Sequence, residues 1–264
     1  MLHRLRAALS SAALETRASE LRTRTVLSRG HLYGTAEDTD DAFTPGLPVS
    51  LRPIRASDGS QWRAARIEDQ HLLQPFEPTT AVGWDDAHSP EAWRKNFHNL
   101  QVLAADRLIV PMVIDVDGEF AGQLTIGNIQ YGTISSAWIG YWVHSRFQGR
   151  GVATAAVALG VDLGMQEVGL HRIEATVMAE NVASRRVLEK TGFRTEGHLR
   201  RNLHINGQWR DHYLVAQTQE EVLPEGLVRR LVNRGLLGLA GCEPPIASAW
   251  HRRLAHCTGS VAST

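Results

Sequence analysis

Residues 136–154 read Ser136-Ala-Trp-Ile-Gly-Tyr-Trp-Val-His-Ser-Arg-Phe-Gln-Gly-Arg-Gly-Val-Ala-Thr154. An apolar, aromatic segment typical of a β-strand leads here into a turn with two glycines, and a long apolar helix follows. Such a turn presents several backbone N–H groups at a helix N-terminus, which favours an anion. Because Gly149 and Gly151 have no Cβ, a pyrophosphate can approach the main chain closely. The stretch therefore predicts a phosphate-binding strand–turn–helix unit.

The residues of this turn exclude two common nucleotide-binding motifs. The dinucleotide fingerprint G-x-G-x-x-G requires a third glycine, and Thr154 stands in its place. A nucleoside-triphosphate loop requires Gly-Lys followed by Ser or Thr, which this turn does not contain. The match that remains is Gln/Arg-x-x-Gly-x-Gly/Ala over residues 148–153.

Strand and helix signals alternate along the middle of the chain. Ser89-Pro90 begins a helix with an N-cap and a proline at the first position. Asp117-Gly118 and Asn206-Gly207 are hairpin turn signals. The predicted fold class is α/β, of the mixed α+β kind, with a mixed sheet and helices on both faces. Strands are expected over 49–55, 108–116, 119–127, 134–143, 172–178, 199–205 and 208–217, and helices over 89–105, 151–168 and 182–191.

Two further motifs follow the glycine turn in a fixed order. Asn181-Val-Ala-Ser184 begins a helix in the next strand–helix unit, and Leu188-Glu-Lys-Thr-Gly-Phe193 ends it. With the glycine turn, these motifs make residues 49–218 resemble the GNAT superfamily of acetyl-CoA-dependent N-acetyltransferases. The resemblance implies the GNAT fold: a central, mostly antiparallel, splayed sheet flanked by helices.

Four other segments resemble one branch of that superfamily, the ribosomal-protein alanine N-acetyltransferase (RimJ/RimL-like) branch. Many members of this branch act on other amines, so the resemblance favours the reaction type more strongly than the acceptor. The segments are Val49-Ser-Leu-Arg-Pro-Ile-Arg55, Leu73-Gln-Pro-Phe-Glu-Pro78, Ile139-Gly-Tyr-Trp-Val143 and Ile205-Asn-Gly-Gln-Trp-Arg-Asp-His212.

Composition is that of an ordinary globular protein. The 264 residues are 43% hydrophobic and 21% charged, with a formal net charge of +0. This charge balance predicts no direct nucleic-acid partner and no membrane partner. Cys242 and Cys257 form no disulfide framework, which favours the cytoplasm, and the histidines show no metal-ligand spacing. We expect acetyl-CoA and no metal, and a homodimer remains open.

The two ends differ in composition from the middle. Residues 1–46 form an expected N-terminal extension whose Arg-rich start is read either as a transit peptide or as a loosely ordered segment. Residues 47–220 are expected to form the acetyltransferase domain. Residues 221–264 are expected to form a helical extension and tail, with a basic amphipathic helix over 223–239.

The family resemblance also implies where acetyl-CoA binds. Its pantetheine arm is expected in a gap between the strand that ends at Val143 and the strand over 172–178. The N–H of Val143 would stabilise charge on the thioester oxygen. The side chain of Arg150 either binds a phosphate or simply faces solvent. The implied cofactor-binding residues are Trp142, Val143, Gln148, Gly149, Arg150, Gly151, Val152, Ala153, Thr154, Asn181 and Ser184.

The implied catalytic residues each have a structural alternative. Ser184 is expected to protonate the leaving thiolate because related enzymes use serine there, but Asn181 and Ser184 also suit ordinary helix capping. Glu174 is the candidate base, with a salt bridge to a nearby arginine as the alternative. Relatives place a glutamate base where this chain has Leu203 and a tyrosine acid where it has Leu188, and neither leucine moves a proton.

The missing strong base favours one class of acceptor. A protein α-amine of pKa ~7.7–8 needs about 1–1.4 kcal/mol to deprotonate at pH 7, whereas a lysine side chain needs about 4–5 kcal/mol. Phe76, Glu77 and Tyr141 are expected to contact the acceptor. The leading hypothesis is acetyl transfer to a protein N-terminus by direct attack in a ternary complex. A small-amine acetyltransferase and a non-catalytic acyl-CoA-binding module are the alternatives.

Overall fold

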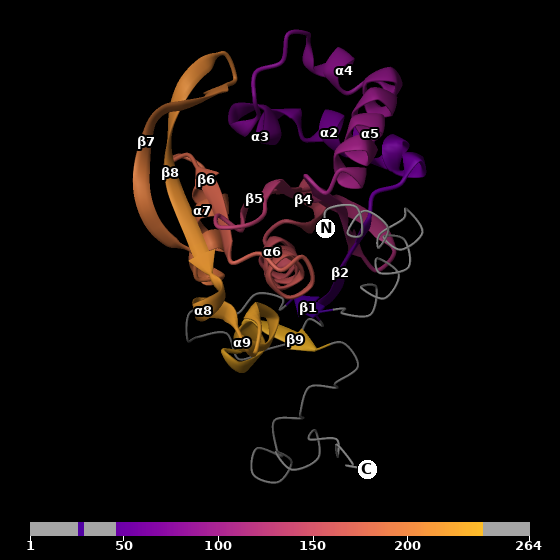
Figure 1. The fold of residues 1–264 in the computed structure, drawn as a ribbon. Helices are drawn as coiled ribbons and strands as arrows, with labels where there is room; N and C mark the ends of the chain where they lie inside the picture. The colour runs from indigo at the N-terminus through magenta and orange to yellow at the C-terminus, as the bar shows by residue number, and fades with distance from the viewer. Residues whose placement is uncertain (1–25, 29–45, 240–264) are drawn as a thin grey trace, which may run out of the picture.

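The fold is built on one nine-stranded sheet, seen in a computed structural model that describes residues 26–28 and 46–239. The strand order is β7-β8-β6-β5-β4-β3-β2-β1-β9 (Figure 1). Only the β5–β6 pair is parallel, and every other neighbouring pair is antiparallel. The strands are β1 (Val26–Ser28), β2 (Leu47–Pro53), β3 (Val110–Val116), β4 (Glu119–Gln130), β5 (Ser136–Val143), β6 (Arg172–Val177), β7 (Arg194–Ile205), β8 (Gln208–Thr218) and β9 (Leu237–Leu239).

Helical segments fill three connections and the region after β8. Between β2 and β3 lie η2 (Ala56–Asp58), α2 (Gly59–Glu68), α3 (Gln70–Leu73), η3 (Gln74–Phe76), α4 (Trp84–Ala87) and α5 (Pro90–Ala105). Between β5 and β6 lie η4 (Ser145–Phe147), α6 (Val152–Asp162) and the π-helical turn η5 (Leu163–Glu167). Helix α7 (Val182–Lys190) precedes β7, and α8 (Gln219–Val222) and α9 (Leu227–Asn233) follow β8.

Two apolar clusters pack against opposite faces of the sheet. The larger cluster contains α6, whose residues Ala155, Ala156 and Val157 are fully buried against strand side chains such as Ile139. The smaller cluster joins α2 and α5 to the other face, and it is rich in tryptophan: Trp62, Trp84, Trp93 and Trp142. Helix α6 therefore packs over β2, β4 and β5 on one face of the sheet (Figure 1).

The local turn and cap signals of the sequence are confirmed. Asn206 and Gly207 both have positive φ, 42° and 82°, as a type I′ hairpin turn requires. Asp117 and Gly118 repeat this pattern at 54° and 84°. The Oγ of Ser89 accepts the N–H of Ala92 at 3.2 Å and caps α5.

The predicted helix over 223–239 is wrong, because only Leu227–Asn233 is helical. Gly226, at φ 85°, precedes this helix, and Gly235, at φ 72°, ends it by returning its N–H to the carbonyl of Val232. The chain then forms β9, which pairs with β1 at the edge of the sheet. The predicted helix over 151–168 is also shorter, because α6 ends at Asp162 and a π-helical turn follows.

Some expectations fall outside the described residues: the Arg-rich start, the tail after Leu239, Cys242 and Cys257. The division into 1–46, 47–220 and 221–264 stays a prediction. Within residues 26–28 and 46–239, no helix has the length and apolar character needed to cross a bilayer. Over the same residues, no group of three or more potential ligands is placed to hold a metal ion.

Candidate active site

Strands β5 and β6 pair only at one end. Ser136, Ala137 and Trp138 lie opposite Arg172, Ile173 and Glu174, and no pairing follows. Strand β5 nevertheless continues to Val143 and β6 to Val177. The unpaired part of these two strands, beyond Trp138 and Glu174, is called the seam below. The seam lies where the family resemblance implies a splayed gap for the pantetheine arm.

The main chain of Val143 faces this seam. The N–H of His144 donates to the carbonyl of Ala121 at 2.8 Å, as part of the β4–β5 ladder. Because successive residues of a strand turn their N–H groups to opposite edges, the N–H of Val143 points away from β4 and toward the β6 side. The side-chain amide of Gln148 donates to the Val143 carbonyl at 2.8 Å. Gln148 thus fixes the end of the strand beside the seam.

Trp142 is oriented differently from its neighbour. By the same alternation its main chain belongs to the ladder with β4. Its indole is buried in the smaller apolar cluster, with the guanidinium of Arg66 4.3 Å from the ring centre. The indole of Trp142 therefore lies on the opposite face of the sheet, and its role as a cofactor-binding residue stays a prediction.

The glycine turn has the conformation of an anion site. Gly149 and Gly151 have φ of 71° and 79°, a region that suits glycine, and Gly151 stands immediately before α6. The first N–H groups of an α-helix have no intrahelical acceptor, so those of Val152, Ala153 and Thr154 are available to a ligand. The Arg150 side chain is exposed beside them. The helix dipole adds to the attraction for a phosphate.

Asp69, which the sequence did not single out, supports this turn from a distance. It follows α2, is 1% exposed, and accepts the N–H of Ser145 at 2.6 Å. The neighbouring Glu68 lies 3.3 Å from Nε2 of His144. Two consecutive acidic side chains therefore tie the helices on one face of the sheet to the start of the turn. No sequence pattern predicts this contact, because its partners are far apart in the chain.

We expect Asp69→Ala to destabilise the protein by about 1–3 kcal/mol, since it leaves the part-buried Ser145 N–H without this acceptor. The loosened turn should also raise the KM for acetyl-CoA. Asp69→Asn keeps an acceptor oxygen in the same shape and should stay close to the unsubstituted protein. Thermal melts and steady-state kinetics of both variants test this. Equal behaviour of the alanine and asparagine variants would remove Asp69 from the support of the turn.

Across the seam, the structure brings Ser184 and Tyr141 together. The Oγ of Ser184 lies 3.0 Å from the hydroxyl oxygen of Tyr141. The backbone N–H of Ser184 donates to Oδ1 of Asn181 at 3.1 Å, so Asn181 caps α7. The cap uses the backbone of Ser184, which leaves the serine hydroxyl out of it. The capping alternative therefore applies to Asn181 and not to the side chain of Ser184.

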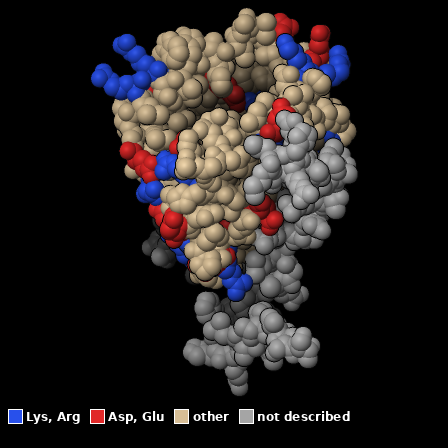
Figure 2. All heavy atoms as spheres, in the orientation of Figure 1, with Lys and Arg blue, Asp and Glu red and all other residues tan. Residues whose placement is uncertain are grey.

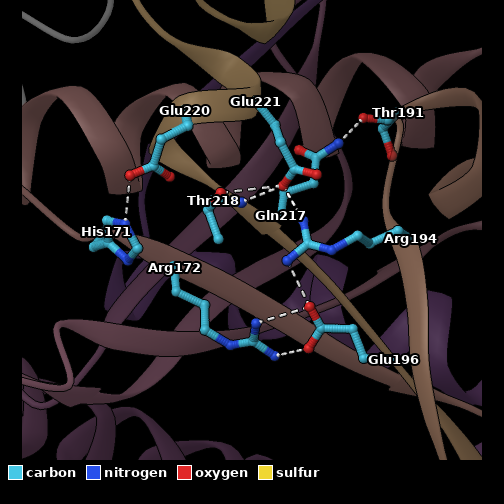
Figure 3. Close-up of polar contacts among 9 residues, drawn as sticks. All are labelled: His171, Arg172, Thr191, Arg194, Glu196, Gln217, Thr218, Glu220 and Glu221. Carbon is cyan, nitrogen blue, oxygen red and sulfur yellow. Dashed lines mark hydrogen bonds and ion pairs between the residues drawn. The ribbon is translucent and has the colours of Figure 1, made fainter.

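Glu174 lies at the paired end of the seam, opposite Trp138. At about 3.3 Å per residue, Val143 is about 16 Å farther along β5. The carboxylate of Glu174 accepts Nε of Arg172 at 3.1 Å, so the salt-bridge alternative is observed. Figure 3 shows Arg172 continuing to Glu196 and then to Arg194. A base role for Glu174 stays a prediction that this placement does not favour.

The hydrogen bonds from Arg172 and Arg194 also affect the pKa of Glu196. The pKa of Glu196 is lowered, first by its hydrogen bond from Arg172. This network joins β6 to β7 across β8 and stabilises the hairpin that stands beside the seam.

On the side of the sheet away from α6, a cavity of about 250 Å³ lies where β6 ends. A bridge between Pro78 and Ile205 and a hydrogen bond from the Thr79 N–H to the His204 carbonyl, 2.9 Å, tie the loop after η3 to the tip of the β7–β8 hairpin. Figure 2 shows the upper part of the molecule hollowed, with acidic and basic atoms in the hollow. The cavity is lined by Pro75, Phe76, Met178, Glu180, Ile205, Asn206, Gln208 and Arg210.

The predicted acceptor residues Phe76 and Glu77 take different places at this cavity. Phe76 is 37% exposed and lines the cavity. Glu77 binds the buried Arg66 at 2.5 Å, and its carbonyl accepts the N–H of Asn206. Tyr141 lies on the other face, against Ser184. The structure therefore places two of the three expected acceptor residues on one side of the sheet.

Known proteins are similar to this chain in both fold and sequence. Residues 49–194 match the acetyltransferase (GNAT) domain family. The structure of Mycobacterium smegmatis RimJ in complex with CoA-disulfide is 49% identical, with a TM-score of 0.71, covering 73% of this chain and 91% of that one. The probable N-acetyltransferase YjcK of Bacillus subtilis is 34% identical over 65% of this chain and 94% of its own length. The [Ribosomal protein uS5]-alanine N-acetyltransferase of Escherichia coli is 30% identical over 63% and 87%.

The chain belongs to the GNAT acetyltransferase family. It is an acetyl-CoA-dependent N-acetyltransferase of the RimJ type, and the predicted fold, enzyme class and acetyl donor are confirmed. The open seam, the N–H of Val143 and the glycine turn fit that donor, because they offer main-chain donors to the pantetheine arm with its thioester and to a pyrophosphate.

Proposed function

We propose that the enzyme acetylates the α-amine of a protein N-terminus, with a ribosomal protein as the acceptor type. The observation that carries the proposal is the pair of neutral hydroxyls, Tyr141 and Ser184, beside the free end of the seam. The candidate carboxylate, Glu174, stands at the other end in an ion pair with Arg172. A site of this kind suits an amine that loses its proton easily.

The free-energy cost of deprotonation separates the amine classes. At pH 7 an α-amine requires about 1–1.4 kcal/mol and a lysine amine about 4–5 kcal/mol. The name of the Escherichia coli relative, an enzyme for the alanine of uS5, supports the same class of acceptor. The cavity beside Phe76 and the bridged loop of residues 77–79 would accommodate the first residues of a peptide.

Each site residue has a role in this proposal. The N–H of Val143 stabilises negative charge on the thioester oxygen, and Ser184 gives its proton to the leaving sulfur. Residues 149–154 bind the pyrophosphate. The acetyl donor enters on the side of α6 and the acceptor on the side of α2, so the amine attacks directly while both are bound. Action in the cytoplasm and a homodimer stay predictions.

The test compares two peptides of one sequence that contains a single lysine, one with a free α-amine and one blocked there. We expect thiol release from acetyl-CoA with the free peptide, with acetylation mapped to its α-nitrogen by mass spectrometry. The blocked peptide should react at less than a tenth of that rate. Equal rates would overturn the N-terminal proposal, and turnover only on a small amine would favour the small-amine alternative. Binding of coenzyme A without any turnover would favour the acyl-CoA-binding module.

A further inference from the structure

The hydroxyl of Tyr141 bridges β5 and α7. Its oxygen lies 3.0 Å from Oγ of Ser184 and 3.4 Å from the carbonyl oxygen of the same residue. Tyr141 packs against the larger apolar cluster, and the backbone of Ser184 is held by the Asn181 cap. Because both residues are anchored on regular elements, the contact between their hydroxyls is a fixed feature of the fold.

Two arrangements of hydrogen are compatible with these oxygen atoms. In the first, Tyr141 donates to Oγ of Ser184, and the serine proton is free to point into the seam. In the second, Tyr141 donates to the carbonyl of Ser184, and the serine proton is used to bond Tyr141. The distances favour the first arrangement, since Oγ is the nearer acceptor by 3.0 against 3.4 Å.

Burial keeps the tyrosine in its neutral form. It raises the pKa of Tyr141 to about 12, although the hydrogen bond with Ser184 acts in the opposite direction. A phenol with this pKa retains its proton at neutral pH. It is therefore a constant donor and not a group that switches.

We propose that Tyr141 is a positioning residue that directs the hydroxyl proton of Ser184 into the seam. The inference rests on the proposed role of Ser184 as proton donor. An aliphatic hydroxyl is a weak acid, and negative charge grows on Oγ as its proton leaves. A donor at 3.0 Å both orients that proton and stabilises the charge.

Every proton is accounted for in the acetyl-transfer step. The lone pair of the acceptor nitrogen forms a bond to the thioester carbon, the carbon–sulfur bond breaks with its electron pair on sulfur, and sulfur takes the proton of Ser184. The acceptor nitrogen loses a proton when it becomes an amide, and solvent returns that proton to Oγ. Tyr141 keeps its own proton throughout. The net change is one amide and one thiol.

The test is a double-mutant cycle of Tyr141→Phe and Ser184→Ala, with Tyr213→Phe as the matched control. Tyr213 packs near the same helix, with the guanidinium of Arg185 5.9 Å from its ring, and its hydroxyl is not bonded to Ser184. Each variant is assayed for kcat, for the KM for acetyl-CoA, for coenzyme A affinity by calorimetry and for melting temperature.

We expect Tyr141→Phe to lower kcat at least 10-fold while KM, coenzyme A affinity and melting temperature stay close to the unsubstituted values. In the Ser184→Ala background the same change should alter kcat less than twofold, and Tyr213→Phe should have no effect on kcat. The positioning role of Tyr141 would be overturned, with the role of Ser184 left standing, if Tyr141→Phe left kcat unchanged or if the two losses multiplied in the double variant. Unchanged kcat in Ser184→Ala would instead show that the proposed proton donor is wrong.

Discussion

Ser184→Ala should lower kcat about 100-fold or more, which is the size of a general-acid contribution. The loss corresponds to about 2.7 kcal/mol of transition-state stabilisation. Stability should not change, because the cap of α7 uses the backbone N–H of Ser184, which alanine retains. Steady-state kinetics and a thermal melt on the same preparation measure the two quantities.

Asn181→Ala is the matched control, because it removes the cap and leaves the serine hydroxyl. It should cost about 0.5–2 kcal/mol of stability, the usual value for an N-cap. The two variants thus separate loss of the proton donor from loosening of the helix. If Ser184→Ala melts lower and retains its kcat, Ser184 is a structural residue and the proton donor must be sought elsewhere.

Gly149→Asp should weaken coenzyme A binding by roughly 10- to 100-fold. A Cβ at Gly149 would meet no atom within 4 Å, so a short side chain fits there. Asp and Asn are the non-glycine residues that best tolerate the positive φ of 71°. The new carboxylate would lie close to the expected pyrophosphate, where like charges at about 4 Å repel by about 1–4 kcal/mol.

Gly149→Asn is the control of the same shape without the charge. Its coenzyme A affinity, measured by calorimetry, should remain near that of the unsubstituted protein. The difference between the two variants should shrink at high salt, because salt screens an exposed charge pair. Equal affinity of the Asp and Asn variants would place the pyrophosphate away from residues 149–154.

Local signals in the sequence predicted much of the fold. The Asn206-Gly207 turn, the Ser89 cap and the apolar run of α6 each depend on a few adjacent residues, and all three are present. The family resemblance supplied the expected site, including Ser184 and Val143. Where the prediction failed, a glycine and a distant partner decided the outcome. Gly235 ends α9 early, and the residues after it form β9 by pairing with the distant β1.

The residues that support the site could not be predicted from the sequence, for a similar reason. Asp69 acts on Ser145, and Tyr141 acts on Ser184, through contacts that only the tertiary structure creates. The family resemblance implied Trp142 as a cofactor-binding residue, and the sequence did not show on which face of the sheet its indole lies. The alternation of a strand sends the two neighbouring side chains to opposite faces, so Trp142 packs with Arg66 instead.

The pairing of β1 with β9 bears on how the chain matures during synthesis. Val26 lies opposite Leu239, so the last strand of the sheet adds to one of the first to leave the ribosome. Among the described strands, this edge of β1 therefore stays unpaired until residues 237–239 have been synthesised. Pairing between such distant segments is slow, and an uncovered edge strand invites association with other chains in the meantime. We accordingly expect nascent chains arrested before β9 to associate with other chains more readily than chains that include it.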